Sequence, residues 1–303
     1  MFKVVITQIF VLLFFINHGQ VNASEAVSAL LDPYEQEDVV RKSTAQKIPL
    51  LAVIPAAGRG ARFGEAGVLK PKGFIEVEGK PIIHSSIEHL VCGGIERILF
   101  ITGHCSKYYE ELAGEYMHPI VDLLHNPDYA KFGNMHTICL AKDSVAESIL
   151  LLDSDIIYPV SALQALISDP HPNVLLSTTT TKSGDEVYVE ADKNGNLVKL
   201  SKNKDELEID SESVGIYKLS RECFQAMCTS YEAALKENPN LKMEYEHGLV
   251  AVCKEHPVHV LKMRFEDQCP WTEIDTQEHY ERTVSYVLPL MKELEKKSKE
   301  SHI

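Results

Sequence analysis

From residue 50 onward, short apolar runs alternate with longer segments whose apolar positions recur at helical spacing. The apolar runs, which we expect to form buried strands, are "LLAVIP" at 50–55, "RILFITG" at 97–103, "PIVDLLHN" at 119–126 and "SILLLDSD" at 148–155. The segments between them, 81–94, 106–116 and 133–145, fit helices, with Ser106 expected as an N-cap. Strictly alternating strands and helices predict a mostly parallel sheet covered on both faces.

The second half of the chain has a different pattern. It contains further strand-like runs at 173–180, 213–220 and 257–265, and a hairpin over 185–201 that turns at Asn194-Gly195. Two amphipathic segments, 221–237 and 276–297, predict helices. We therefore expect one domain over residues 49–298, in which the second half adds substrate-facing strands to the sheet begun by the first.

The N-terminal segment does not fit this pattern. Residues 1–23 combine Lys3, an apolar stretch to Ile16 and a small-residue site near Ala23, which is typical of a secretory signal. The apolar stretch is shorter than a usual membrane span. Residues 24–48 are polar and mixed, and we interpret them as a linker.

Composition disfavours one class of partner, and the cysteines and the N-terminal segment indicate different locations for the protein. The formal net charge is -14, which disfavours nucleic acid as a partner because binding to the phosphate backbone needs a basic surface. The seven cysteines contain no CxxC pair, which favours reduced thiols in the cytoplasm. The signal-like segment favours secretion or membrane anchoring, and the sequence leaves both open. A homo-oligomer is equally compatible with the sequence.

A glycine-rich basic loop follows the first strand. "GRGARFGEAGVLKPK" places Gly58, Gly60, Arg62 and Lys72 directly after an apolar run. Glycines let a ligand approach backbone N–H groups, and Arg and Lys donate charge-assisted hydrogen bonds to phosphate. The loop lacks both the GxxxxGK[ST] pattern and the GxGxxG spacing. It favours a polyphosphate ligand, although a tight structural turn would use the same glycines.

Two groups of carboxylates also follow strands. Asp153 and Asp155 end the run "LLLDSD", and Asp275 lies in "WTEID" before the last helical segment. Ligands of open parallel sheets bind at the carboxyl ends of the strands, so the loop and this DSD pair are expected on one rim. Carboxylate oxygens suit Mg²⁺. Exposed acids at a strand end, and a helix N-cap for Asp275, are the structural alternatives.

Taken together, five segments resemble one family. The glycine-rich loop, "PKGFIEVEGKPII", "NPDYAKFGNMHTICLA", "LLLDSDIIY" and "WTEID" are similar, in this order, to nucleotidyltransferases of the sugar-phosphate and choline-phosphate type. The resemblance extends over about residues 50–287, and it is closest to bacterial CTP:phosphocholine and 2-aminoethylphosphonate cytidylyltransferases. It implies a Rossmann-like three-layer α/β/α sandwich and a Mg²⁺-dependent reaction of CTP with a small phosphate or phosphonate that releases pyrophosphate.

The resemblance also assigns roles by motif. It implies that Lys72 stabilises the α-phosphate, that Arg62 holds the β- and γ-phosphates, and that Mg²⁺ lies between Asp155 and Asp275. The residues expected around the nucleotide are Ala56, Ala57, Gly58, Gly60 and Asn134.

The acceptor is less well defined by the sequence. Choline-specific relatives carry an aromatic residue near the segment that matches "GDEVYVE", where this chain has Val187 beside Tyr188. We expect Glu190, Glu246 and Trp271 to contact the acceptor, which favours 2-aminoethylphosphonate slightly over phosphocholine. A sugar-1-phosphate nucleotidyltransferase and a non-catalytic nucleotide-binding protein on the same fold remain as alternatives.

Overall fold

A computed structural model describes residues 51–60 and 69–300 of the chain. Its central sheet has a parallel half, in the order β6-β1-β4-β5, made of β1 (Leu51–Ala56), β4 (Arg97–Thr102), β5 (Ile120–His125) and β6 (Ile149–Leu152). These are the four apolar runs that the sequence predicts as strands. β1 and β6 are buried almost throughout, as continuous apolar runs in a parallel sheet require.

The other half of the sheet is mixed. It contains β8 (Val174–Thr178), β9 (Tyr188–Ala191), β10 (Leu197–Ser201), β11 (Ser211–Leu219) and β12 (His259–Met263). The long strand β11 joins the halves, since it runs antiparallel to β6 on one side and to β8 on the other, while its first residues also pair with β9. β12 extends this half by pairing parallel to β8.

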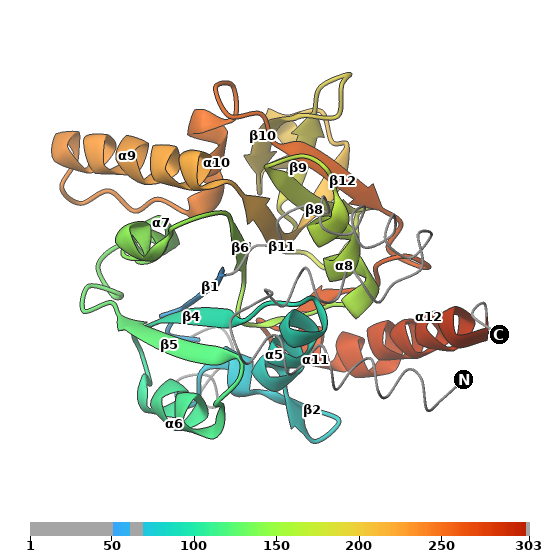
Figure 1. The fold of residues 1–303 in the computed structure, drawn as a ribbon. Helices are drawn as coiled ribbons and strands as arrows, with labels where there is room; N and C mark the ends of the chain where they lie inside the picture. The colour runs from blue at the N-terminus through green and yellow to red at the C-terminus, as the bar shows by residue number, and fades with distance from the viewer. Residues whose placement is uncertain (1–50, 61–68, 301–303) are drawn as a thin grey trace, which may run out of the picture. The chain divides into compact units, whose positions relative to one another are not determined.

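Helices cover both faces of the sheet and give three layers (Figure 1). One face packs against α5 (Ile82–Cys92), α6 (Lys107–Glu115), α8 (Val160–Ser168) and the C-terminal α12 (Leu288–Glu300). The other face packs against α7 (Asn134–Cys139), α9 (Arg221–Glu237) and α10 (Tyr245–Val252). The predicted α/β/α sandwich is therefore confirmed.

Several short elements complete the fold. They are β2 (Glu76–Val77), β3 (Lys80–Pro81), β7 (Ile156–Ile157), β13 (Thr272–Glu273), α11 (Gln277–Arg282), the π-helical turn Thr283–Val287 and the 3₁₀ turns Lys72–Phe74, Lys142–Ser144 and Lys204–Glu206. The π-helical turn interrupts the single C-terminal helix that the sequence predicts. Neither α8 nor α10 was predicted from the sequence. Ser106 occupies the predicted N-cap position of α6, but its hydroxyl donates to Glu110 and accepts no backbone N–H.

The predicted signal-like segment 1–23, the linker 24–48 and Arg62 lie outside the described residues. Within the described residues, no helix is both long enough and apolar enough to cross a membrane. The boundaries of the predicted domain, 49–298, stay a prediction.

Candidate active site

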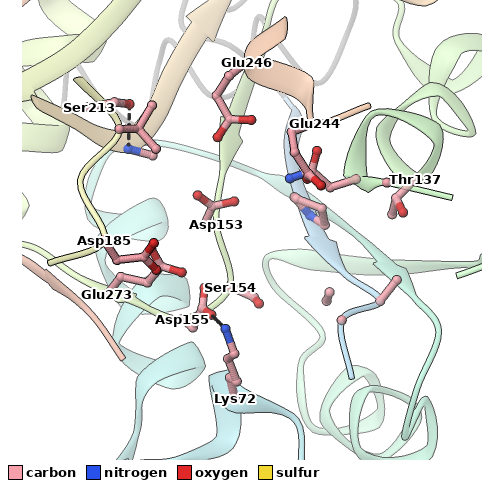
Figure 2. Close-up of a pocket in the computed structure, with 18 of the residues that line it drawn as sticks. Lys72, Thr137, Asp153, Ser154, Asp155, Asp185, Ser213, Glu244, Glu246 and Glu273 are labelled. Atoms are coloured by element: carbon pink, nitrogen blue, oxygen red, sulfur yellow. Dashed lines mark hydrogen bonds and ion pairs between the residues drawn. The ribbon is translucent and has the colours of Figure 1, made fainter. Parts of the chain in front are cut away.

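A cavity of about 580 Å³ opens at the carboxyl ends of β1 and β6 (Figure 2). The residues that follow β1, the start of α7 and the residues that follow β6 all line it. β11 and the segment around β13 close the far side. The cavity therefore lies where parallel sheets usually bind ligands, and where the sequence places the glycine-rich loop and the DSD carboxylates.

One wall of the cavity is formed by backbone and small side chains. Ala56, the last residue of β1, and Ala57 and Gly58, which follow it, line this wall, and Asn134 lines it at the first turn of α7. The Asn134 side-chain oxygen accepts the backbone N–H of Tyr245 (2.6 Å), so this side chain holds α7 against the start of α10. Gly60 adopts a positive φ of 61° beyond the cavity lining, at a turn that disfavours other residues.

Lys72, Asp155 and Glu273 line the base of the cavity, and Asp275, which is fully buried and not among the lining residues, lies next to them. The Lys72 ammonium donates to Asp155 Oδ2 (2.9 Å) and forms an ion pair with Asp275. Glu273 joins them, and one oxygen from each of Asp155, Glu273 and Asp275 lies within 4.8 Å of the others. We call these three residues the metal cluster.

A two-strand ladder explains why distant parts of the chain meet there. β7 pairs antiparallel with β13, with Ile156 opposite Glu273, and the Ile274 N–H donates to the Asp155 carbonyl (3.1 Å). Since alternate residues of an extended segment point the same way, Glu273 and Asp275 both face Asp155. Asp275 is not the helix cap, because the Thr276 hydroxyl accepts the His279 N–H at the start of α11.

Burial and mutual repulsion act on the metal cluster. The side chain of Asp275 has no exposed surface, and that of Asp155 is 11% exposed. Burial first, and then the Asp155 charge, raise the pKa of Glu273 to about 7, while Lys72 opposes the shift. The cluster is thus a dehydrated anionic site that favours a cation.

A second pair of carboxylates, Asp153 and Glu246, faces the middle of the cavity (Figure 2). The Tyr245 hydroxyl donates to Asp153 Oδ2 (2.8 Å). Glu246 Oε2 is buried and has no hydrogen-bond partner among the described residues. Burial raises the pKa of Glu246 to about 7, and burial followed by the Asp155 charge raises the pKa of Asp153 well above its ordinary value.

Gly215 makes room for this pair. It adopts a φ of +80° within β11, and a Cβ atom there would lie 2.5 Å from Asp153 Oδ2. Its carbonyl also accepts the Asp153 N–H (3.2 Å). Any larger residue would displace the Asp153 carboxylate from the cavity.

Of the other two residues predicted to contact the acceptor substrate, one lines the cavity and one does not. Trp271 lines the cavity, and its indole N–H donates to Thr178 Oγ1 (2.8 Å), which fixes the ring. Glu190 is not among the lining residues, and its carboxylate accepts the Glu208 N–H instead (3.1 Å). Glu190 therefore does not reach the site in this structure. It lies on β9, where its side chain contacts the backbone of Glu208.

Several residues that line the cavity were not predicted from the sequence. Glu273 was signalled by its spacing of two from Asp275. Lys202 follows β10 and forms an ion pair with Asp185 across the cavity (2.8 Å), which no sequence pattern indicated. The cavity also has more aromatic lining than the sequence suggested, namely Tyr109, Tyr129, Phe132 and Trp271.

Comparison with known families agrees with this geometry. The model of the MobA-like NTP transferase domain matches residues 52–260, more than half of the chain. The protein belongs to the MobA-like NTP transferase family. The match includes the β1 loop, Lys72, both DSD aspartates and Glu246, and it ends before Trp271, Glu273 and Asp275.

Curated relatives are similar over part of their length. A CMP-5'-(3-aminopropyl)phosphonate synthase of Streptomyces rubellomurinus is 29% identical over 156 residues, 51% of this chain and 25% of that protein. A 2-aminoethylphosphonate cytidylyltransferase of Lancefieldella rimae is 32% identical, over 44% of this chain and 49% of that protein. A choline-phosphate cytidylyltransferase of Streptococcus pneumoniae is 34% identical, over 34% of this chain and 44% of that protein. The chain therefore spans a quarter to a half of these relatives.

Solved structures share the fold over most of the chain. The inositol-1-phosphate CTP transferase from T. maritima superimposes with a TM-score of 0.67 and 20% identity, over 82% of this chain and 97% of that one. The CTP:phosphocholine cytidylyltransferase from Streptococcus pneumoniae does so with a TM-score of 0.65 and 21% identity, over 78% and 98%. At this identity the likeness concerns the fold.

Proposed function

We propose that this MobA-like protein is a Mg²⁺-dependent cytidylyltransferase that transfers CMP from CTP to a small phosphonate or phosphate and releases pyrophosphate. The observation that carries the proposal is the convergence of Lys72 with Asp155, Glu273 and Asp275 at the base of a cavity whose other wall is backbone suited to a nucleotide. Cytidylyltransferases among the similar proteins support the choice of CTP.

The metal cluster fits Mg²⁺ by its chemistry. Mg²⁺ takes hard oxygen ligands, usually one or two carboxylates together with phosphate oxygens and water. Asp155 and Asp275 would hold the ion, and Glu273 lies within reach as a further carboxylate. When bound, Mg²⁺ neutralises charge on the triphosphate and on the departing pyrophosphate.

The transfer itself needs positioning and neutralisation of charge. A phosphonate or phosphate oxygen of the acceptor attacks the α-phosphorus of CTP, and the bond from that phosphorus to the oxygen bridging to the β-phosphate breaks. The attacking oxygen is already anionic near neutral pH and needs no general base. Lys72, which in this structure pairs with the metal cluster, is the cation that stabilises the α-phosphate in the transition state.

The same cavity favours an acceptor with a primary ammonium group. A primary ammonium donates three hydrogen bonds, whereas a trimethylammonium donates none. Asp153 and Glu246 offer buried acceptor oxygens, and Glu246 Oε2 has no partner among the described residues. Since sites built on hydrogen bonds reject analogues that lack them, 2-aminoethylphosphonate is favoured over phosphocholine.

An aromatic cage is the specific alternative for the acceptor. Such a cage holds trimethylammonium by cation–π contacts with several ring faces. Trp271 lines the cavity together with Glu273 and Asp185, and the sequence resemblance aligns Val187 with the aromatic of choline-specific relatives. Tyr109, Tyr129 and Phe132 also line the cavity, but Glu246 Oε2, which has no hydrogen-bond partner among the described residues, favours hydrogen bonding to an ammonium over a cage.

Release of pyrophosphate tests the proposal. Purified full-length protein with Mg²⁺ is incubated with CTP or UTP and with 2-aminoethylphosphonate, phosphocholine or glucose-1-phosphate. We expect release that requires CTP together with an aminophosphonate or choline phosphate. Preference for UTP with glucose-1-phosphate would support a sugar-phosphate nucleotidyltransferase. No release with any pair would support a non-catalytic nucleotide-binding protein.

A further inference from the structure

A second group of metal-ligating side chains lies at the opposite end of the sheet from the candidate active site. It contains Asp169, which follows α8, His171 in the connection to β8, and His259, the first residue of β12. β8 and β6 both run antiparallel to β11, so β8 begins at the end of the sheet where β6 begins. Asp155, by contrast, follows the end of β6. The two groups are therefore separated by the length of the strands.

The two histidines converge on one carboxylate. His171 Nδ1 lies 2.8 Å from Asp169 Oδ1, and His259 Nε2 lies 3.8 Å from Asp169 Oδ2. The two imidazole rings stack with their centroids 4.0 Å apart and their planes inclined by 22°. One ligand atom from each residue lies within 4.8 Å of the others.

These distances are close to those around a single ion. Zinc binds histidine nitrogen and carboxylate oxygen at about 2.0–2.2 Å, so two such ligands on a tetrahedral ion lie about 3.3–3.5 Å apart. The separation of 3.8 Å between His259 and Asp169 is too long for a hydrogen bond and slightly wider than this value. Binding of an ion requires the pair at 2.8 Å to open and the stacked rings to turn until both nitrogens face one point, and the half-exposed His171 ring has room for this movement.

Two of the three residues are anchored by the fold. The Asp169 side chain is only 8% exposed, its Oδ1 accepts the His171 backbone N–H (2.9 Å), and the Lys218 ammonium donates to its backbone carbonyl. His259 is fixed in the sheet, where its N–H donates to the Asn173 carbonyl (2.9 Å) and its ring packs against Gly195. A ligand set in which two members are held in place loses less conformational freedom on binding an ion.

We propose that Asp169, His171 and His259 form a binding site for a transition-metal ion such as Zn²⁺, distinct from the Mg²⁺ site. Two imidazoles and one carboxylate suit zinc, nickel or copper, whereas Mg²⁺ prefers oxygen ligands alone. The ion would connect the end of α8 to the start of β12 and leave further coordination positions to water. The proposal does not depend on the proposed cytidylyltransferase activity.

Calorimetric titration of the full-length protein with Zn²⁺ tests the site. Saturating Mg²⁺ is present to compete at the carboxylates of the metal cluster, and a reductant that does not chelate zinc keeps the cysteines as thiols. We expect His171→Ala and His259→Ala each to weaken one Zn²⁺-binding event by about 10- to 100-fold, at least as much as losing an outer-shell partner usually does. The matched control is His256→Ala. His256 lies in the connection between α10 and β12, outside the cluster, and this variant is expected to bind Zn²⁺ as the wild type does.

Thermal unfolding provides a second readout. If Zn²⁺ binds the folded state at this site, it raises Tm in the wild type and in His256→Ala, and it raises Tm by less in His171→Ala at the same Zn²⁺ concentration. His171 is exposed, so its replacement by alanine is expected to leave the Tm of the metal-free protein unchanged. Unaltered Zn²⁺ affinity and unaltered Zn²⁺-dependent Tm in both alanine variants of the cluster would overturn the proposal, as would the absence of any Zn²⁺ binding to the wild type.

Discussion

Two groups of carboxylates, each partly or fully buried, lie at one cavity and differ in how their charge is balanced. The metal cluster, Asp155, Glu273 and Asp275, has the Lys72 ammonium in contact with two of its members. The pair Asp153 and Glu246 accepts a hydrogen bond from the Tyr245 hydroxyl at Asp153. Among the described residues, no Lys or Arg forms an ion pair with either carboxylate. A backbone hydrogen bond and then the Lys202 charge lower the pKa of Glu246, but Lys202 forms its ion pair with Asp185.

This difference suggests two different ligands. A buried anionic site that the protein balances itself can exchange its lysine for a metal ion as substrate binds. A buried anionic pair without a cation is costly unless a ligand supplies one. We therefore attribute the first group to Mg²⁺ and the second to the ammonium group of the acceptor.

The largest expected effect comes from breaking the metal cluster. Alanine at Asp155 or at Asp275 should lower kcat by about 10²-fold or more, comparable to the loss of a key electrostatic group. Steady-state pyrophosphate release with CTP measures it, and the exposed Asp143→Ala variant is the control. Near-wild-type kcat in either cluster variant would remove its residue from the metal site.

Removal of the balancing lysine should separate binding from catalysis. If Lys72 acts on the α-phosphate mainly in the transition state, Lys72→Ala lowers kcat by about 10²-fold and raises the KM for CTP much less. Initial rates over a range of CTP concentrations distinguish the two parameters. An effect confined to KM would mean that Lys72 binds only ground-state phosphates.

A change in the second group should affect the acceptor selectively. Glu246→Gln keeps the shape of the side chain and removes its charge, so kcat/KM for 2-aminoethylphosphonate should fall by about 10- to 100-fold, the range for one hydrogen bond to a charged group. Activity with ethylphosphonate, which lacks the amine, should stay unchanged. Equal losses with both acceptors would show that Glu246 does not contact the ammonium.

The smallest expected effect is a gradual change in the free energy of unfolding with pH. The pKa of Glu246 in the folded protein is about 7, above its ordinary value of 4.5, so the native state binds more protons than the unfolded chain between these values. The free energy of unfolding contributed by Glu246 therefore falls as pH rises from 4.5 to 7, by at most about 1.4 kcal/mol per pH unit.

Urea unfolding of Glu246→Gln across this pH range measures that contribution. The variant should show a shallower decline than the wild type, and the exposed Glu255→Gln variant should match the wild type. A decline as steep in Glu246→Gln as in the wild type would mean that Glu246 is charged in the folded protein at low pH.

The fold could be predicted from the sequence to the extent that its elements are periodic. The four parallel strands are continuous apolar runs, and α9 is a regular amphipathic segment over the predicted residues 221–237. The sequence reading overlooked α8, which is apolar enough to read as a continuation of the neighbouring strands. The C-terminal helix was predicted without its π-helical turn, a local backbone feature that periodicity does not report.

The candidate site could be predicted where its residues follow strands. Asp155 was found because a polar residue after an apolar run marks the end of a strand, whereas Lys72 stood out at the end of the glycine-rich basic loop and Asp275 was assigned to the site only through the family resemblance. Glu190 was placed in the site because it lies in the same predicted hairpin as Val187, and the structure puts only Val187 in the cavity. Residues that meet through tertiary pairing, such as Lys202 with Asp185, had no signal in the sequence.

Competition between two acceptors tests the central claim most directly. Wild-type protein, Mg²⁺ and CTP are mixed with equal concentrations of 2-aminoethylphosphonate and phosphocholine, and the two CMP products are quantified early in the reaction. Their ratio equals the ratio of the two kcat/KM values. We expect the aminophosphonate product in excess by about tenfold or more, a difference of about 1.4 kcal/mol. A comparable excess of the choline product would contradict the account, and would mean that Trp271 and its neighbours form an aromatic cage.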